Sequence, residues 1–157
     1  MIISYHEDYS ELKKTALEAR ERSITWDKKP FPTKVGVAVQ TKDGQIFGGY
    51  NIDAHSHVQN IHAEVLAMLK ALDAGYRKAT DFEAIVEAYE DSSAPGKIYP
   101  MCAYCRQFVW DFTHKDLVVI VINLEGKELF RGTLEELYPH PYPSIERKIA
   151  KRRTNFE

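Results

Sequence analysis

The chain has little of three features that would point to particular classes of protein. It holds only two cysteines among 157 residues, which excludes a dense disulfide scaffold. It has no apolar run near the roughly 20 residues that a membrane helix needs. Its formal charge of −2 gives no overall attraction to nucleic acid or anionic lipid. The first residues, MIISYHEDYSELKK, become polar too early for a secretion signal. We therefore expect a cytoplasmic protein without a membrane partner.

The length suits one globular domain, and we interpret residues 1–157 as such, with 139–157 forming a C-terminal arm. With 44% hydrophobic residues, a chain of this size can bury a core without disulfide support. The arm carries several prolines and then a basic cluster over 147–153. Such a cluster can bind nucleic acid. In a chain of negative net charge, however, a solvated helix or a contact between subunits is favoured, and nucleic acid is not expected as a partner.

Hydrophobic periodicity and turn signals predict elements in the order α-β-β-α-β-α-β-β-α. Helices are predicted over 8–22, from near 62 to 75, over 103–112 and from 133, and strands over 35–39, 45–50, 82–89, 117–122 and 128–130. Residues 51–60, between the second predicted strand and the second predicted helix, are polar and are predicted to form an irregular loop. This order predicts an α/β fold with a mixed sheet of about five strands sandwiched between helices. The pattern leaves two-layer and three-layer packing open.

Two short motifs carry the candidate chemistry. His62-Ala63-Glu64 begins one predicted helix, and Cys102-Ala-Tyr-Cys105 begins another. A catalytic zinc site takes three protein ligands and leaves the fourth position to water. One imidazole and two thiolates meet that need, and helix N-termini favour the thiolate form. We therefore predict a Zn²⁺ cofactor bound by His62, Cys102 and Cys105.

Glu64 is the predicted catalytic residue. It lies two positions after His62, so its carboxylate points away from the ligand direction and can lean over the open zinc position. A carboxylate placed there can take a proton from water and return it to a leaving amine.

Other interpretations of the same residues remain open. The two cysteines form a C-x-x-C pair, which also occurs in thioredoxin-like redox sites, although the usual Gly-Pro between the cysteines is missing here. A structural zinc would need a fourth protein ligand, and His55 or His57 could supply it. In that case the protein would be a zinc-stabilised binding or assembly protein without catalysis. His55 and His57 could instead grip a substrate or lie exposed to solvent.

With these motifs in view, the chain resembles the cytidine deaminase family in its small single-domain form. The resemblance runs from about Val35 to Pro139 and includes Val35-Gly-Val-Ala, the hairpin ending in Asn51-Ile-Asp53, both zinc motifs, Cys105-Arg106-Gln107, and Thr133-Leu-Glu-Glu-Leu-Tyr-Pro139. The pair of zinc motifs also matches the H-x-E and C-x-x-C signature of zinc deaminases. The resemblance implies hydrolytic loss of ammonia from an aminated pyrimidine nucleoside such as cytidine or deoxycytidine. It further implies a homo-oligomer, a tetramer or a dimer.

The resemblance also implies substrate contacts by Asn51, Asp53 and Ala63. In the family an Asn and a Glu of an N-x-E-N segment hold the ribose hydroxyl groups. Here Asp53 is one methylene shorter than that Glu, and Ala54 replaces the second Asn. Met101 stands where a Pro usually precedes the first Cys, and His62 stands where small members commonly have another Cys.

These departures leave the reaction class unchanged and bear on the substrate. Blasticidin-type deaminases share the zinc signature without the full ribose-binding segment. A modified nucleoside or another amino-heterocycle, including a purine or pterin, is therefore an alternative substrate. Aromatic residues Tyr104 and Phe108 flank the second motif and could stack on a base, although core packing is favoured for Phe108.

Overall fold

The computed structural model describes residues 8–26, 33–91, 94, 96–98 and 100–142. A mixed sheet of five strands forms its centre, in the order β2-β1-β3-β4-β5. The strands are β1 (Gly36–Thr41), β2 (Ile46–Tyr50), β3 (Phe82–Ala88), β4 (Val118–Ile122) and β5 (Glu128–Thr133). β3 and β4 are parallel, whereas the β1–β2, β1–β3 and β4–β5 pairs are antiparallel. The predicted α/β class and mixed sheet are confirmed.

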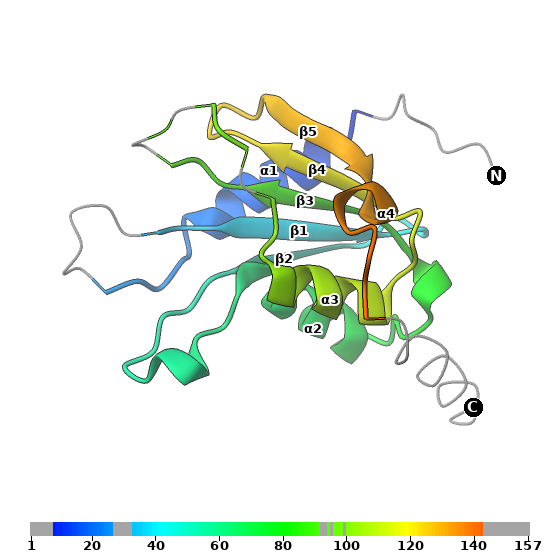
Figure 1. Ribbon diagram of the computed structural model, residues 1–157, viewed down its shortest axis with the longest axis horizontal. Coiled ribbons are helices and arrows are strands. Elements are labelled where there is room, and N and C mark those ends of the chain that lie inside the picture. The colour runs from blue at the N-terminus through cyan, green and yellow to red at the C-terminus, as the bar shows by residue number, and fades with distance from the viewer. Residues whose placement is uncertain (1–7, 27–32, 92–93, 95, 99, 143–157) are drawn as a thin grey trace.

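Helices cover both faces of the sheet, which gives three layers (Figure 1). The helices are α1 (Ser10–Arg20), α2 (Ala63–Asp73), α3 (Ala103–Phe112) and α4 (Leu134–Leu137), with 3-10 turns η1 (His57–Gln59) and η2 (Ala79–Asp81). α1 packs on one face against β1, β2 and β3, and α2 packs on the other face with α3 beside it. The short α4 lies next to β4 and β5.

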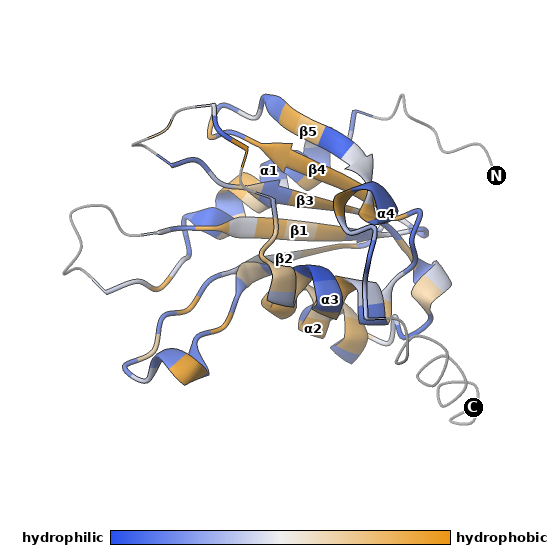
Figure 2. Cartoon of the chain, viewed as in Figure 1, coloured by the Kyte–Doolittle hydropathy of each residue, from blue (hydrophilic) through white to orange (hydrophobic). Residues whose placement is uncertain are grey.

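Alternating side chains of the central strands feed two separate cores. In β3, Ala84 and Val86 point to the core under α1, and Ile85 points to the core under α2 and α3. β4 is buried at every position, as expected for a strand covered on both faces. Its residues are hydrophobic along the whole strand (Figure 2). The core under α2 and α3 reaches Ala63 and Cys105, so the motif helices begin where this core ends.

Close packing fixes α2 against the sheet. At Gly49 in β2, a Cβ atom would lie 2.2 Å from the carbonyl oxygen of Ala63 and 2.5 Å from the amide nitrogen of Ala67. Only glycine leaves room for this approach of strand and helix backbones. The start of α2, which carries His62 and Glu64, is therefore placed by a contact between backbones.

The predicted elements differ from the observed ones mainly at their ends. α1 begins at Ser10 and ends at Arg20, within the predicted range of 8–22. β5 continues to Thr133, where the capping box of α4 begins as predicted. The loop over 51–60 contains η1, and Ile52 forms isolated bridges that give this segment a defined path. Of the predicted arm over 139–157, the structure describes only 139–142, and the basic cluster lies outside the described residues.

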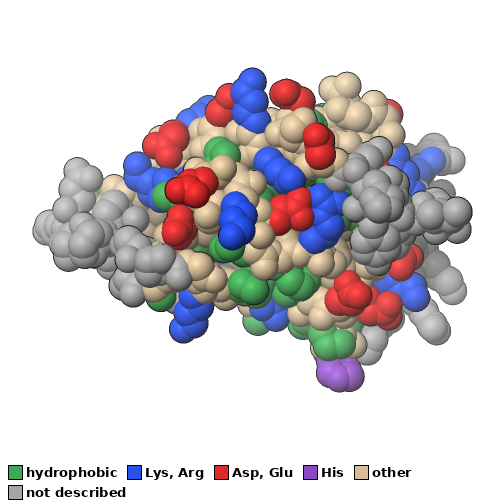
Figure 3. Space-filling view, turned by 90° about the horizontal axis from the view of Figure 1, so that it is seen from above, with side chains coloured by type: hydrophobic (Ala, Val, Ile, Leu, Met, Phe, Trp, Pro, Cys, Tyr) green, Lys and Arg blue, Asp and Glu red, His purple; other side chains and the backbone are tan. Residues whose placement is uncertain are grey.

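No helix in the described ranges is long and apolar enough to cross a membrane. Figure 3 shows one face of the molecule, seen from the β5 side, on which basic and acidic side chains are interspersed. Neither sign of charge dominates that face, in keeping with the small net charge of the chain.

Candidate zinc site

The two sequence motifs lie side by side at the beginnings of α2 and α3. His62 is the N-cap residue of α2 and Cys102 is the N-cap residue of α3, and both have extended backbone. Neither side chain makes the hydrogen bond to its own helix that an N-cap residue often makes. Both side chains are thus available to a shared ligand, together with Cys105 from the first turn of α3.

The distances between these three side chains fit a zinc ion. The Nδ1 atom of His62 lies 3.5 Å from Sγ of Cys102 and 3.2 Å from Sγ of Cys105. The three ligand atoms lie within 4.8 Å of one another. A tetrahedral zinc ion with ordinary bond lengths holds a sulfur ligand and a nitrogen ligand about 3.5 Å apart. Both cysteines are free thiols, as a metal site requires.

The geometry of the described residues bears on whether His55 or His57 supplies a fourth zinc ligand. Within the described ranges, His62, Cys102 and Cys105 form the group that could hold a metal, and neither His55 nor His57 joins it. The ring of His55 instead stacks on Trp26, with ring centroids 4.0 Å apart. An open ligand position is the arrangement of a catalytic zinc site, whereas structural sites are filled by four protein ligands.

Glu64 lies beside the cluster, as its spacing predicted. Its Oε2 accepts a hydrogen bond from the Cys105 thiol over 3.3 Å, and the residue is only 5% exposed. Burial raises the pKa of the Glu64 carboxyl above its ordinary range. Burial, followed by the nearby Glu64 charge, also raises the pKa of the Cys105 thiol. A bound metal ion would lower the pKa of the Cys105 thiol instead, because a thiol that coordinates a metal is deprotonated.

Arg106 and Gln107 complete the second motif by holding the backbone around it. Arg106 donates from Nε to the Met101 carbonyl oxygen over 2.6 Å and from Nη1 to the Leu137 carbonyl oxygen over 3.3 Å. Oε1 of Gln107 accepts hydrogen bonds from the Tyr138 hydroxyl and the Tyr142 amide. The Arg-Gln pair therefore joins the cysteine loop to the segment after α4.

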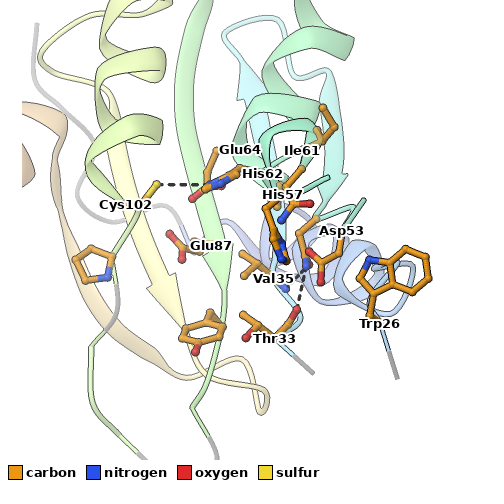
Figure 4. Close-up of a pocket in the computed structure, with 15 residues that line it drawn as sticks. Trp26, Thr33, Val35, Asp53, His57, Ile61, His62, Glu64, Glu87 and Cys102 are labelled. Atoms are coloured by element: carbon orange, nitrogen blue, oxygen red, sulfur yellow. Dashed lines mark hydrogen bonds between the residues drawn. The ribbon is translucent and has the colours of Figure 1, made fainter. Parts of the chain in front are cut away.

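A pocket of about 440 Å³ opens next to the cluster. Its size lies within the range of small-molecule sites. His62, Glu64 and Cys102 line one side of the pocket. Trp26, Thr33, Val35 and residues of the 51–61 segment line the other (Figure 4). Binding a small molecule here would bring it directly against the zinc ligands.

The predicted substrate residues all line this pocket. Ala63 is 1% exposed and is the first residue of α2, where backbone N–H groups have no partner within the helix. Asp53 points toward the pocket from the loop after β2 (Figure 4). Asn51 accepts from the Val35 amide over 2.8 Å and donates to the Thr33 carbonyl oxygen over 2.9 Å. Asn51 therefore also shapes the pocket wall.

Two of the lining residues were not predicted as site residues. Trp26 and Glu87 line the pocket, and neither belongs to a recognisable motif. His57, in η1, also lines the pocket. Tyr104 is 60% exposed, and its ring meets the His62 ring edge-on, with the two ring centroids 5.5 Å apart. Phe108 packs against the core under α2 and α3, which was the favoured interpretation.

Comparison with known proteins places these features in a family. Residues 6–121 match the family described as "Cytidine and deoxycytidylate deaminase zinc-binding region". The chain belongs to this family. It is accordingly a zinc-dependent aminohydrolase with a His/Cys/Cys zinc site at His62, Cys102 and Cys105.

Individual relatives of this aminohydrolase carry two kinds of name. A blasticidin-S deaminase of Bacillus cereus is 30% identical over 109 residues, which are 69% of this chain and 76% of the relative. A cytidine deaminase of Halalkalibacterium halodurans is 31% identical over 133 residues, or 84% of this chain and 92% of the relative. The crystal structure of a cytidine deaminase from Burkholderia pseudomallei superimposes with a TM-score of 0.74 at 31% identity, covering 87% of this chain and all of that one.

Proposed function

We propose that this enzyme deaminates a free aminated pyrimidine nucleoside by hydrolysis and releases ammonia. The observation that carries the proposal is the juxtaposition of three elements: the His62, Cys102 and Cys105 cluster, the buried Glu64 carboxyl, and the pocket beside them. In this reaction the exocyclic C–N bond between a ring carbon and its amino group breaks, and a C–O bond to the same ring carbon forms. The oxygen comes from water, and the product is a carbonyl compound.

The residues divide the work as follows. When bound, zinc supplies Lewis-acid chemistry and lowers the pKa of water from about 15.7 toward about 7. Glu64 takes a proton at its carboxylate and delivers it to the departing amine. Burial raises the pKa of the Glu64 carboxyl above its ordinary range, which helps the group to hold a proton between accepting and releasing it. The buried setting of Glu64 also keeps bulk water from competing for that proton.

Ala63, Asn51 and Asp53 are proposed to orient the substrate. Ala63 lines the pocket at the start of α2, and its backbone N–H is proposed to donate a hydrogen bond to a ring carbonyl. Asp53 offers a carboxylate to hydroxyl groups. Asn51 keeps the Thr33–Val35 segment against the pocket, and its amide retains a second hydrogen and a second lone pair for a ligand.

A modified nucleoside or another amino-heterocycle is the second candidate substrate. Two observations favour it: the similarity to blasticidin-S deaminase, and the use of both ends of the Asn51 amide by backbone groups of this chain. An Asn side chain held by two backbone groups has less freedom to adjust its position to the hydroxyl groups of a ribose. The reaction at the zinc site is the same for both candidates.

The partner and location are further proposals. We propose a homo-oligomer, as the resemblance to the family implies. The exposed side chains of Val58, Leu69 and Tyr104, which are 95%, 46% and 60% exposed, are candidates for the contact. We also propose cytoplasmic location and no nucleic-acid partner, as the composition predicts. Gel filtration with light scattering tests the oligomer, and a single-protomer mass would contradict it.

An ammonia-release screen tests the reaction. The zinc-loaded enzyme is offered cytidine, deoxycytidine, substituted cytosines, blasticidin S, guanine and adenosine. We expect turnover of at least one compound and a loss of roughly 10²- to 10⁴-fold in kcat for Glu64→Ala. The zinc content of that variant should stay unchanged, and Glu125→Ala, at an exposed turn, is the matched control. Full activity of Glu64→Ala would remove Glu64 from the reaction.

A further inference from the structure

Glu87 is a carboxyl in the interior of the sheet that the reaction described above does not use. It lies in β3, opposite Val37 of β1 and Val121 of β4. Alternation along the strand puts it on the same face as Ile85, the face covered by α2 and α3. Its position near the carboxyl end of β3 brings it into the pocket, where it lies between Cys102 and Val35 with Glu64 close by (Figure 4).

The Glu87 side chain is almost fully buried, and one of its two carboxyl oxygens has no hydrogen-bond partner in the described part of the chain. It is 6% exposed, and its Oε2 has no hydrogen-bond partner among the described residues. Two other buried side-chain atoms of the described chain share this property, Nε of Arg20 and Nε1 of Trp110, and neither residue lines the pocket. A buried carboxyl oxygen without a hydrogen bond destabilises a fold. We therefore expect a ligand to supply the missing hydrogen bond.

Among the described residues, Glu87 forms no ion pair with a cation. The charge of the Arg106 guanidinium lowers the pKa of the Glu87 carboxyl, but Arg106 donates its hydrogen bonds to the carbonyl oxygens of Met101 and Leu137. Burial raises the pKa of the Glu87 carboxyl well above its ordinary range, and the charges of Glu64 and Cys102 act in the same direction. Because Glu87 lines the pocket and its Oε2 has no hydrogen bond in the described part of the chain, a molecule in the pocket can supply one.

We propose that Oε2 of Glu87 accepts a hydrogen bond from the substrate, and that the enzyme selects amino-heterocycles with a second N–H or O–H donor on the ring system. This donor is separate from the amine that leaves. The inference rests on the proposed deaminase function and narrows its substrate class. It holds for either protonation state, because a carboxyl oxygen accepts a hydrogen bond whether the group is neutral or ionised.

The proposal separates substrates that otherwise look alike. The base of cytidine carries no donor apart from its leaving amine, since its remaining ring positions present a carbonyl oxygen, a nitrogen lone pair and C–H groups. A pyrimidine with an added amino or hydroxymethyl group, or a diaminated purine, has the extra donor. A substrate without the donor leaves Glu87 buried and unpaired, which penalises its binding.

Matched substrate pairs test this selection. One pair is 5-aminocytidine against 5-methylcytidine, which differ in the donor and little in size, and the other is 2,6-diaminopurine riboside against adenosine. With the zinc-loaded enzyme we expect kcat/KM to favour the donor member of at least one pair by roughly 10- to 100-fold. Glu87→Leu should abolish that preference, and Glu87→Gln, which keeps an amide oxygen, should retain part of it. Glu83→Gln in the same strand, outside the pocket, is the control.

A binding measurement separates this inference from the proposed reaction. Calorimetric titration of zinc-loaded Glu64→Gln with both members of each pair reports affinity without turnover, and the donor member should bind roughly 10- to 100-fold more tightly. The double variant Glu64→Gln/Glu87→Leu should lose that difference. Turnover of both pairs without preference would overturn the inference and leave the deaminase function standing. If the donor member of a pair binds more tightly but the natural enzyme releases no ammonia from any compound, the Glu87 contact is supported and the proposed reaction is contradicted.

Discussion

The Nε atom of Arg106 donates a hydrogen bond to the carbonyl oxygen of Met101, the residue before the first zinc cysteine, over 2.6 Å. The same guanidinium reaches the Leu137 carbonyl oxygen at the end of α4. Two parts of the chain that are far apart in sequence are thereby joined behind the metal ligands. Because Cys102 has no side-chain capping bond of its own, this arginine is a main support for the backbone that presents its sulfur.

Replacing this arginine should loosen the zinc site. Arg106→Lys keeps the charge but cannot make two directed hydrogen bonds from one planar group. Since outer partners of metal ligands typically contribute 10- to 100-fold in metal affinity, we expect zinc loss to a chelator to rise by roughly tenfold or more. Arg77→Lys is the matched control, because Arg77 donates from Nε to the Leu72 carbonyl oxygen at an exposed helix end. Equal rates of zinc loss in both variants would contradict the supporting role.

The metal site was predictable because its information is local. His62 and Cys102 each come just before a predicted helix, and a residue at that position has extended backbone that turns its side chain away from the helix axis. Cys105 then follows one turn later. Two such short motifs, with ligand types that suit zinc, define the site without knowledge of the packing between them.

Other features depend on contacts that the chain makes over long distances. In β3, Glu87 follows apolar residues at a position that equally suits a solvent-facing side chain, and only the packing of α2 and α3 over that face buries it. The role of Asn51 in holding the Thr33–Val35 segment depends likewise on a hydrogen bond across 16 residues. Side-chain alternation predicts which residues share a face, but it does not predict which face is covered.

The contact of Gly49 with α2 gives a test of how the site helix is positioned. Gly49→Ala would place a methyl group 2.2 Å from the Ala63 carbonyl oxygen, so strand and helix must separate. We expect a loss of about 1–3 kcal/mol in the free energy of unfolding, together with weaker zinc binding. At the neighbouring Gly48 the new methyl would meet Thr15 at 3.3 Å on the α1 face, and Gly48→Ala should cost less than about 1 kcal/mol. Urea denaturation of both variants compares them, and a smaller effect at Gly49 would be inconsistent with the backbone contact.

The ion pairs of Glu128 predict how stability depends on pH. Hydrogen bonds from Arg131 and Lys13 hold the pKa of the Glu128 carboxyl at about 2, below its ordinary value of 4.5. A depressed pKa stabilises the fold above pH 4.5, and this contribution is lost as the pH falls toward 2. Because the group is partly exposed, we expect only about 1 kcal/mol at pH 7.

Comparison of variants isolates this contribution from the acid release of zinc. Glu128→Gln should be less stable than the natural protein at pH 7, and the difference should shrink between pH 4.5 and 2 in urea titrations. Glu135→Gln removes an exposed pair with Lys115 at 3.7 Å, and it should change stability little at any pH. A difference at Glu128 that stays constant down to pH 2 would argue against the ion-pair account.

Glu87 gives the last test, because a group kept for a ligand should destabilise the protein that holds it. Replacing its unpaired buried carboxyl by the apolar side chain of Glu87→Leu should raise the unfolding free energy of the zinc-loaded enzyme by about 1–3 kcal/mol. For a domain of this size that is a rise of roughly 2–4 °C in Tm per kcal/mol. The same variant should lose the preference for donor-bearing substrates. Glu87→Leu would then be more stable than the natural protein but less selective. Calorimetry of the zinc-loaded natural protein, Glu87→Leu and the control Glu83→Leu measures the first effect. If Glu87→Leu unfolds at a lower temperature than the natural protein, its carboxyl has a partner within the fold, and the burial of Glu87 serves the structure and not the substrate.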